Sequence, residues 1–376
     1  MHLYIHIPFC RANCSYCNFY FSVNRRHEGR FFGALLAELR QRKDEIAGYG
    51  PLQTVYLGGG TPSLARTEHL ETLFGQIRKT FSPAAGAEIT LEANPDDITP
   101  RRLDLWKKLG INRLSVGIQS FRQQDLDLMR RSHTAEQSRR ALDWIRRAGY
   151  RNVTVDLIYG IPGMNMTDWE EQLDIFLDYG FPHLSAYALT VEPDTLLDRK
   201  VRAGKVMMPD DEVYEAHFFL LRDKMLRAGF EHYEISNFAR PGWYSRHNSA
   251  YWESKPYVGL GPSAHSYNGK DLRRWNLANL HRYIRGLEKA EPYYETEVLS
   301  PADRYNEYIM TRLRTARGVD ETVIERHFAD FYGDFVQQAQ QLKARGDVCK
   351  QGNFWTICPG ALFRSDGVIA EMFLVE

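Results

Sequence analysis

Before about residue 200 the chain repeats one pattern, in which a short β-branched or aromatic run ends at a Gly or Pro turn and an amphipathic helical stretch follows. Such alternation predicts βα units and a parallel sheet. The six strand-like runs are LYIHIPF, TVYLGGGTP, ITLEANPDD, RLSVGIQSF, VTVDLIYGIP and LSAYALTVEP. The helical stretches include Phe31 to Ile46 and Glu136 to Gly149. The predicted fold class is therefore α/β, either a partial barrel of the (β/α)6 type or an open doubly wound sheet.

Polar residues near the strand ends favour the barrel. Tyr4 and His6 alternate with apolar residues, so they share one face of the first predicted strand. Glu92, Gln119 and Asp156 each fall at or near the C-terminal end of a later strand. In α/β barrels that end carries the site, built from several strands at once. One such residue alone would be a polar side chain meeting a loop, but the set predicts a site.

The pattern changes after about residue 200. Residues Asp210 to Phe230 have the spacing of an amphipathic helix, and Glu231 to Trp275 is dense in Gly, Tyr, Trp, Asn and His. From about Ser300 the sequence predicts further helices and then a hairpin around CKQGNFWTIC. We therefore expect a small, mainly helical C-terminal domain that ends in a β-hairpin.

Charge and hydropathy narrow the classes of function. Lys plus Arg and Asp plus Glu each number 48 in 376 residues. A net charge near zero predicts no global attraction to nucleic acid or anionic membrane. No apolar run has the length of a membrane span, and the N-terminal MHLYIHIPFC lacks the features of a signal peptide. We expect a cytoplasmic protein without a nucleic-acid partner or membrane span, which leaves peripheral membrane contact open.

Three of the five cysteines, Cys10, Cys14 and Cys17, lie directly after the first predicted strand. An odd cysteine count with three clustered fits a reducing compartment better than a disulfide framework. A zinc site would need a fourth ligand, and structural zinc usually takes two separated cysteine pairs. An iron–sulfur cluster held by three thiolates would leave one iron open to a substrate or cofactor. On the residues alone, both metal sites stay open.

The CxxxCxxC loop resembles the cluster loop of the radical S-adenosylmethionine (SAM) superfamily. The motifs GGGTP, EANPDD, VGIQSF, DLIYGIPG, HYEISNFA, HNSAYW and GLGPSAHS extend the likeness over nearly the whole chain. In this order they resemble the HemN/HemW family, and within it the HemW group. The resemblance implies a radical SAM barrel core over 1–235, a connecting segment with the HNxxYW motif over 236–295 and a HemN-type C-terminal domain over 296–376.

The resemblance also implies roles for single residues. Cys10, Cys14 and Cys17 would hold a [4Fe–4S] cluster, and SAM would chelate the fourth iron. The positions that match SAM or cofactor contacts in the family are Tyr4, Tyr16, Gly58, Gly59, Gly60, Thr61, Glu92, Gln119, Arg131 and Asp156. The three glycines would bring bare backbone close to the methionine end of SAM, together with Thr61. A guanidinium suits a carboxylate, so Arg131, with Arg130 as the alternative, would bind that group, and Asp156 would bind ribose hydroxyls.

HNSAYW matches the HNxxYW pattern that the HemW group associates with heme. A neutral imidazole can ligate heme iron, so His247 would be the axial ligand, while Tyr251 and Trp252 can flank a flat apolar ring. Without the resemblance, a hydrogen-bonded histidine in an aromatic core is the commoner role for His247.

Other residues compete for the same role. His6, His232 and His265 each lie in a family-like motif and are rival heme ligands. Cys349 and Cys358 have the setting of ordinary small apolar residues in the predicted hairpin, with a Cys-ligated heme as a weaker alternative.

The family holds more than one function. HemN-type members are oxygen-independent coproporphyrinogen III dehydrogenases that decarboxylate two propionates with a SAM-derived radical. HemW-type members are heme chaperones, and a third relative group opens heme by radical methyl transfer. HemN-type loops carry an extra cysteine where this chain has Phe19, and HemN-type chains carry an N-terminal arm that we do not expect here.

We therefore expect a HemW-type protein that binds heme and passes it to apo-hemoproteins, respiratory ones among them, and that carries a cluster and SAM. The dehydrogenase and a radical SAM heme-modifying enzyme are the alternatives. Whether the chain is an enzyme stays open, and dehydrogenation of coproporphyrinogen is not expected.

Overall fold

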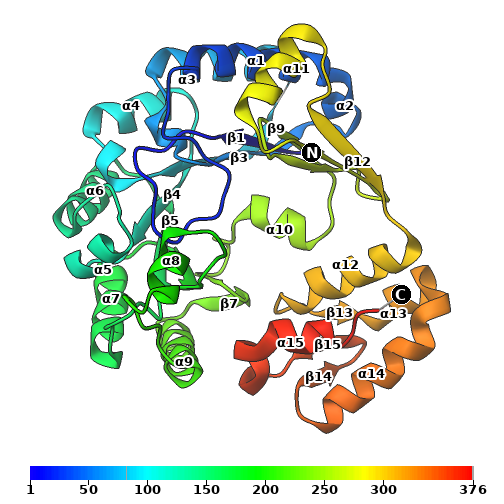
Figure 1. The fold of residues 1–376 in the computed structure, drawn as a ribbon. Coiled ribbons are helices and arrows are strands. Elements are labelled where there is room, and N and C mark those ends of the chain that lie inside the picture. The colour runs from blue at the N-terminus through cyan, green and yellow to red at the C-terminus, as the bar shows by residue number, and fades with distance from the viewer. Residues whose placement is uncertain (82, 375–376) are drawn as a thin grey trace.

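Among the residues that the structure describes, the main sheet has twelve strands and includes all six predicted ones (Figure 1). The computed structural model describes residues 1–81 and 83–374. The predicted strands are β1 (His2–Ile7), β2 (Leu52–Gly59), β3 (Pro83–Ala93), β4 (Arg113–Gln119), β5 (Asn152–Tyr159) and β6 (His183–Ala188). Each pairs in parallel with the next one along the chain. Because their order follows the sequence without the reversal of a doubly wound sheet, the partial barrel is confirmed.

Residues after 230 extend the sheet at both edges. On the β1 side lie β9 (Tyr257–Leu260), β10 (His265–Tyr267), β11 (Leu272–Asn276) and β12 (Tyr294–Val298), and on the β6 side lie β8 (Asn237–Ala239) and β7 (Glu231–Glu234). β9 is parallel to β1, whereas the outer strands pair antiparallel. The region expected to be a connecting segment therefore supplies sheet edges, and the sheet stays open between β12 and β7.

Most helices of the main domain lie around the outer side of the sheet (Figure 1). The helices of this domain are α1 (Glu28–Gln41), α2 (Lys43–Gly48), α3 (Thr67–Thr80), α4 (Pro100–Lys108), α5 (Gln123–Leu128), α6 (Ala135–Arg147), α7 (Met166–Tyr179), α8 (Leu196–Arg202), α9 (Asp211–Arg227), α11 (Leu280–Lys289) and, on the inner side, α10 (Arg246–Trp252). α6 and α9 match predicted helices, while the first predicted helix divides into α1 and α2 at Arg42. Within the described ranges, no helix has the length and apolar character needed to cross a membrane.

Helix α6 shows how the sequence produces these elements. Thr134 and Gln137 form a reciprocal capping box at its N-terminus. Ala141, Leu142 and Ile145 are buried at helical spacing, so one stripe of α6 packs into the core. The polar residues of the remaining surface face solvent.

The two faces of β1 differ, as the alternation predicts. Leu3, Ile5 and Ile7 are fully buried in the main hydrophobic core. Tyr4 and His6 point to the opposite face, where they line a cavity. The inner face of the sheet is therefore available for a site.

The C-terminal region has its own hydrophobic core and lies beside the open side of the sheet (Figure 1). Its helices are α12 (Pro301–Leu313), α13 (Glu321–His327), α14 (Tyr332–Ala344) and α15 (Ser365–Ala370), and its small sheet holds β13 (Val319–Asp320), β14 (Val348–Gln351) and β15 (Phe354–Ile357). The predicted hairpin is β14–β15. It does not end the domain, because α15 follows it and packs on the same core.

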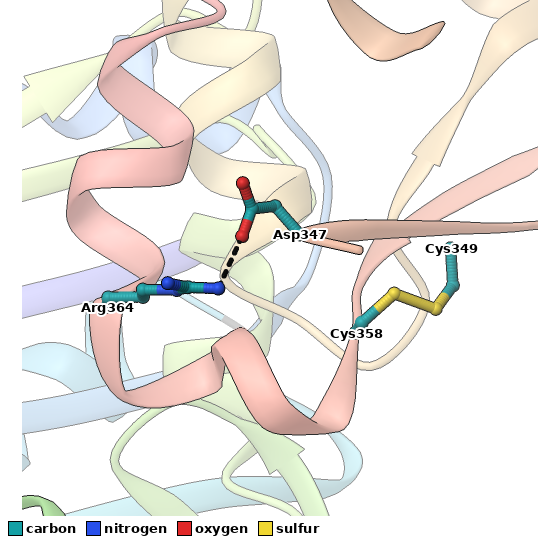
Figure 2. Close-up of a disulfide and its surroundings, with 4 residues drawn as sticks. All are labelled: Asp347, Cys349, Cys358 and Arg364. Atoms are coloured by element: carbon teal, nitrogen blue, oxygen red, sulfur yellow. Dashed lines mark hydrogen bonds and ion pairs between the residues drawn. A yellow bond between two sulfur atoms is a disulfide. The ribbon is translucent and has the colours of Figure 1, made fainter. Parts of the chain in front are cut away.

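A disulfide joins Cys349 to Cys358, across the open end of that hairpin (Figure 2). The expectation that these are ordinary small apolar residues is wrong. Antiparallel pairing brings the two Cα atoms to 5.2 Å, within the bonding range for cysteines. Arg364 donates a 2.6 Å hydrogen bond to Asp347 beside the disulfide and so ties the following turn to the strand (Figure 2). The sequence spacing alone does not reveal this strand register.

Candidate functional site: two adjoining cavities

A cavity of about 670 Å³, here called the cluster-loop cavity, lies at the C-terminal ends of the parallel strands. The predicted site residues that line it are Cys10, Cys14, Cys17, Tyr16, Gly59, Gly60, Thr61, Glu92, Gln119, Arg131 and Asp156. The structure thus brings most of the predicted set together, from a loop after β1 and the ends of β2 to β5. Tyr4, Tyr251 and Trp252 line a second cavity instead. Gly58 and His247 line neither.

The three loop thiols are unpaired and half-buried on the wall of the cluster-loop cavity. The Thr61 hydroxyl lies 3.5 Å from the sulfur of Cys10, and a guanidinium nitrogen of Arg131 lies 3.5 Å from the sulfur of Cys14. Burial raises the pKa of the Cys10 thiol to about 11. Metal binding therefore has to displace its proton.

The three loop thiols share one wall of the cluster-loop cavity. Within the part of the chain that the structure describes, no three His, Cys, Asp or Glu side chains form a group that could hold one metal ion. In a [4Fe–4S] cluster each thiolate binds a different iron, so three separated thiols on one cavity wall fit it.

Two carboxylates face the interior of the cluster-loop cavity. Glu92 accepts hydrogen bonds from the Tyr56 hydroxyl at 2.8 Å and the Gly59 amide at 3.1 Å, and burial raises its pKa to about 6. Asp156 accepts from the Ser115 hydroxyl at 3.3 Å, and burial, followed by the charge of Glu92, raises its pKa to about 7. Raised acid pKa values in a cavity are typical of functional sites. A ligand that brings hydroxyl donors or positive charge would favour the ionised forms.

Arg131, and not Arg130, turns into the cluster-loop cavity; Arg130 is exposed. The Arg131 guanidinium donates to Asn94 Oδ1 at 2.7 Å and to the carbonyl oxygen of Gly117 at 3.0 Å. Its Nε is buried and has no partner among the described residues. An oriented guanidinium with an unused N–H suits an incoming carboxylate.

Strand β4 carries site residues that the sequence reasoning missed. They are Arg113, Ser115 and Gly117, which line the cluster-loop cavity together with the predicted Gln119, at alternate positions of one strand. The period of two that placed Tyr4 with His6 would have found them. Gln119 ends the strand with a left-handed φ of 65°, an uncommon conformation for a side-chain-bearing residue that turns the chain at the cavity wall.

The three glycines of GGGTP are required by packing within the protein itself. A Cβ at Gly59, whose φ is 105°, would lie 2.6 Å from the ring of His6. At Gly60 it would lie 2.8 Å from the backbone of Pro8, and at Gly58 2.9 Å from the Glu92 carboxylate. A larger residue at Gly59 would therefore disturb the contact between β1 and β2 as well as any ligand.

The second cavity, here called the aromatic cavity, has a volume of about 530 Å³. It lies between the β1–β9–β10–β11 edge of the sheet and α12, and Phe19, Gly59 and Glu92 line both cavities. The HNSAYW motif forms α10, from which Tyr251 and Trp252 reach its wall.

The His247 side chain does not line the aromatic cavity and lies behind its wall. It is 1% exposed, and its Nδ1 and Nε2 hydrogen-bond Thr54 at 2.6 Å and Tyr251 at 2.8 Å. Of the rival histidines, His6 and His265 line the aromatic cavity, whereas His232 lines neither cavity.

Comparisons with known proteins identify the family. The sequence profile of the radical SAM superfamily matches residues 4–204. The heme chaperone HemW of Bacillus subtilis is 33% identical over 334 residues, which cover 88% of this chain and 86% of that one. The chain belongs to the radical SAM superfamily and, within it, to the HemW family. The heme chaperone HemW of Escherichia coli is 30% identical over 388 residues, which cover 100% of this chain and 98% of that one.

A solved structure supports the same fold. Coproporphyrinogen III oxidase (HemN) from Escherichia coli, a radical SAM enzyme, aligns with a TM-score of 0.85 and 23% identity over 99% of this chain and 89% of that one. This chain therefore shares its partial barrel and its helical C-terminal region with that protein. Membership of the radical SAM superfamily implies a [4Fe–4S] cluster and SAM, and the free thiols and cavity described above fit both groups.

Proposed function

We propose that this HemW-family chain binds heme and passes it to apo-hemoproteins, while the cluster-loop cavity holds a [4Fe–4S] cluster and SAM. The observation that carries the proposal is the match to curated heme chaperones along nearly the whole chain, including the C-terminal domain. Phe19 supports it, because this position in HemN-type loops holds an extra cysteine. Here the Phe19 side chain is 71% exposed on the rim shared by the two cavities.

The proposed roles in the cluster-loop cavity follow from its side chains. Cys10, Cys14 and Cys17 would hold the cluster, and bound SAM at a reducible cluster supplies radical chemistry. Arg131 would orient the SAM carboxylate through its unpartnered N–H. Asp156 would accept hydrogen bonds from ribose hydroxyls, and the Gly59 and Gly60 backbone would border the methionine end.

Two measurements on anaerobically reconstituted protein test the proposal. A heme titration should saturate near one heme per chain, and the bound heme should move to apo-myoglobin, used as a test acceptor. Under the same conditions, coproporphyrinogen III with SAM and a reductant should be converted little or not at all. Robust decarboxylation would replace the carrier with the dehydrogenase, and a protein that binds no heme would end the carrier proposal.

A further inference from the structure

The aromatic cavity has the shape and lining for a flat apolar ring. Its volume of about 530 Å³ falls within the roughly 300–1,000 Å³ of ordinary ligand pockets. Six of its lining residues are Tyr4, Tyr20, Tyr251, Trp252, Tyr257 and Tyr267. Aromatic faces and edges favour contact with another π-system. A large planar aromatic ligand is therefore the class that this wall fits.

The cavity is lined by two histidines, and only one of them has free ring nitrogens. His6 hydrogen-bonds the Tyr4 hydroxyl through Nδ1 at 3.2 Å and the Tyr20 carbonyl oxygen through Nε2 at 2.9 Å. His265 is exposed, and its ring makes no hydrogen bond with any of the residues that the structure describes. An axial ligand needs an unprotonated nitrogen that points into space. His265 meets that condition without a change in the surrounding bonds.

The His265 ring is held in place by the sheet. It lies on β10 opposite Trp275 of β11, and the two rings stack at an angle of 22°. Arg273, two residues from Trp275, also lines the cavity and lies 2.7 Å from Glu307 of α12. Among the described residues on this wall, Arg273 is the one Lys or Arg side chain, and its remaining N–H groups suit a ligand carboxylate.

The HNSAYW motif contributes to the same cavity in a different way. His247 and Tyr251 are four residues apart on α10, so they lie on one face of the helix. The 2.8 Å bond from His247 Nε2 holds the Tyr251 hydroxyl, while the Thr54 hydroxyl fixes the other ring nitrogen. For His247 to ligate a metal, both it and Tyr251 would have to leave this arrangement. The motif thus places two aromatic side chains in the cavity and uses its histidine to hold one of them, Tyr251.

We propose that the aromatic cavity is the heme site, that His265 is an axial ligand, and that His247 is a positioning residue that holds Tyr251 against the ring. The proposal rests on the proposed function, since it assigns the site of the carried heme. On this arrangement the heme carboxylates meet Arg273, and Phe19 separates the heme from the cluster-loop cavity.

The test compares histidine variants in the cluster-loaded protein. Ferric heme is titrated, and the Soret band and the electron paramagnetic resonance spectrum of the bound heme are recorded. His265→Gly should weaken heme binding by at least roughly 10-fold, because loss of a mere hydrogen-bonding partner of a metal ligand already costs about 10- to 100-fold. It should also abolish the histidine-ligated spectrum, and added imidazole should restore that spectrum. His327→Ala, which changes an exposed histidine of α13 outside both cavities, should leave binding and spectrum unchanged.

Variants of the motif complete the test. Tyr251→Phe keeps the ring and removes the bond to His247, so it should weaken heme binding and leave the ligand spectrum intact. His247→Ala should do the same if the variant folds. A histidine-ligated spectrum that survives in His265→Gly would overturn the proposal, and its loss in His247→Ala would assign the ligand to His247 instead. If the wild type binds no heme at all, the proposed function fails together with this site.

Discussion

The two cavities meet at Phe19, Gly59 and Glu92, yet their walls differ in chemistry and in origin. The cluster-loop cavity collects thiols, buried carboxylates and guanidinium groups from the cluster loop and from successive parallel strands. The aromatic cavity collects Tyr and Trp side chains from β1, the loop after it, α10, β9 and β10. Arg273 of β11 and three residues of α12 complete its wall, so its segments lie up to about 300 residues apart. The repeated βα units therefore build most of the cluster-loop cavity, whereas segments after residue 245 build most of the aromatic cavity.

The largest expected effect is loss of the cluster from the cluster-loop cavity while heme binding persists. Cys10→Ala should abolish stable cluster assembly, because a [4Fe–4S] cluster held by three thiolates loses one of its protein ligands. Iron and sulfide analysis after anaerobic reconstitution measures this loss. Cys349→Ser, at a cysteine of the C-terminal domain that lines neither cavity, is the matched control and should retain the cluster. Heme binding by Cys10→Ala should persist, and its disappearance would show that the cavities do not act separately.

The two cavities share the C-terminal domain, which contributes residues to both walls. The disulfide between Cys349 and Cys358 lies in that domain. Replacing Cys349 and Cys358 with Ser should lower the free energy of unfolding of that domain by about 2–3 kcal/mol, the loop-closure contribution for a short loop. Urea unfolding with and without reductant measures the change, and the double variant should not respond to reductant. An equal response of wild type and variant would argue against a stabilising role of the disulfide.

Asp156→Ala should act on one cavity alone. It should weaken SAM binding by roughly 1–3 kcal/mol, the scale for losing hydrogen bonds to a charged group. Isothermal titration with SAM measures the effect, while the heme affinity should stay at its wild-type value. Asp174→Ala, an exposed carboxylate on α7, is the control. Equal SAM affinity in wild type and Asp156→Ala would remove this residue from the proposed SAM site.

The smallest expected effect is a pH dependence of stability that comes from the cluster-loop cavity. The folded-state pKa of Asp156 is about 7, above the ordinary value of 3.8, because burial disfavours the carboxylate. Its contribution to stability is therefore fully present below about pH 4 and is lost as pH rises through about 7. Asp156→Asn should gain roughly 1–2 kcal/mol of stability relative to wild type between pH 5 and pH 6.5. Urea unfolding at both pH values measures this, and a constant difference would contradict the raised pKa.

Much of the cluster-loop cavity could be predicted, because its residues are close in sequence or recur at the ends of neighbouring strands. Cys10, Cys14 and Cys17 occupy one short loop, which carries all three to the wall of the same cavity. Alternation along a strand placed Tyr4 with His6, and the ends of parallel strands placed Glu92 near Asp156. Arg113 and Ser115 were missed although the same alternation reveals them. The polar residues at the strand ends also favoured the sequential strand order of a barrel over a doubly wound sheet.

Unlike the cluster-loop cavity, the aromatic cavity and the disulfide between Cys349 and Cys358 could not be predicted from local patterns. HNSAYW pointed to His247, but two hydrogen bonds from β2 and α10 hold that ring behind the wall, and no local pattern shows them. Whether His265 faces a cavity depends on how β10 packs near α12, and the pairing of Cys349 with Cys358 depends on one hairpin register. Covalent spacing controls which groups are neighbours within a loop or along a strand. Which distant groups meet, and which of their nitrogens stay free, depends on long-range packing, where small differences among many contacts select one arrangement.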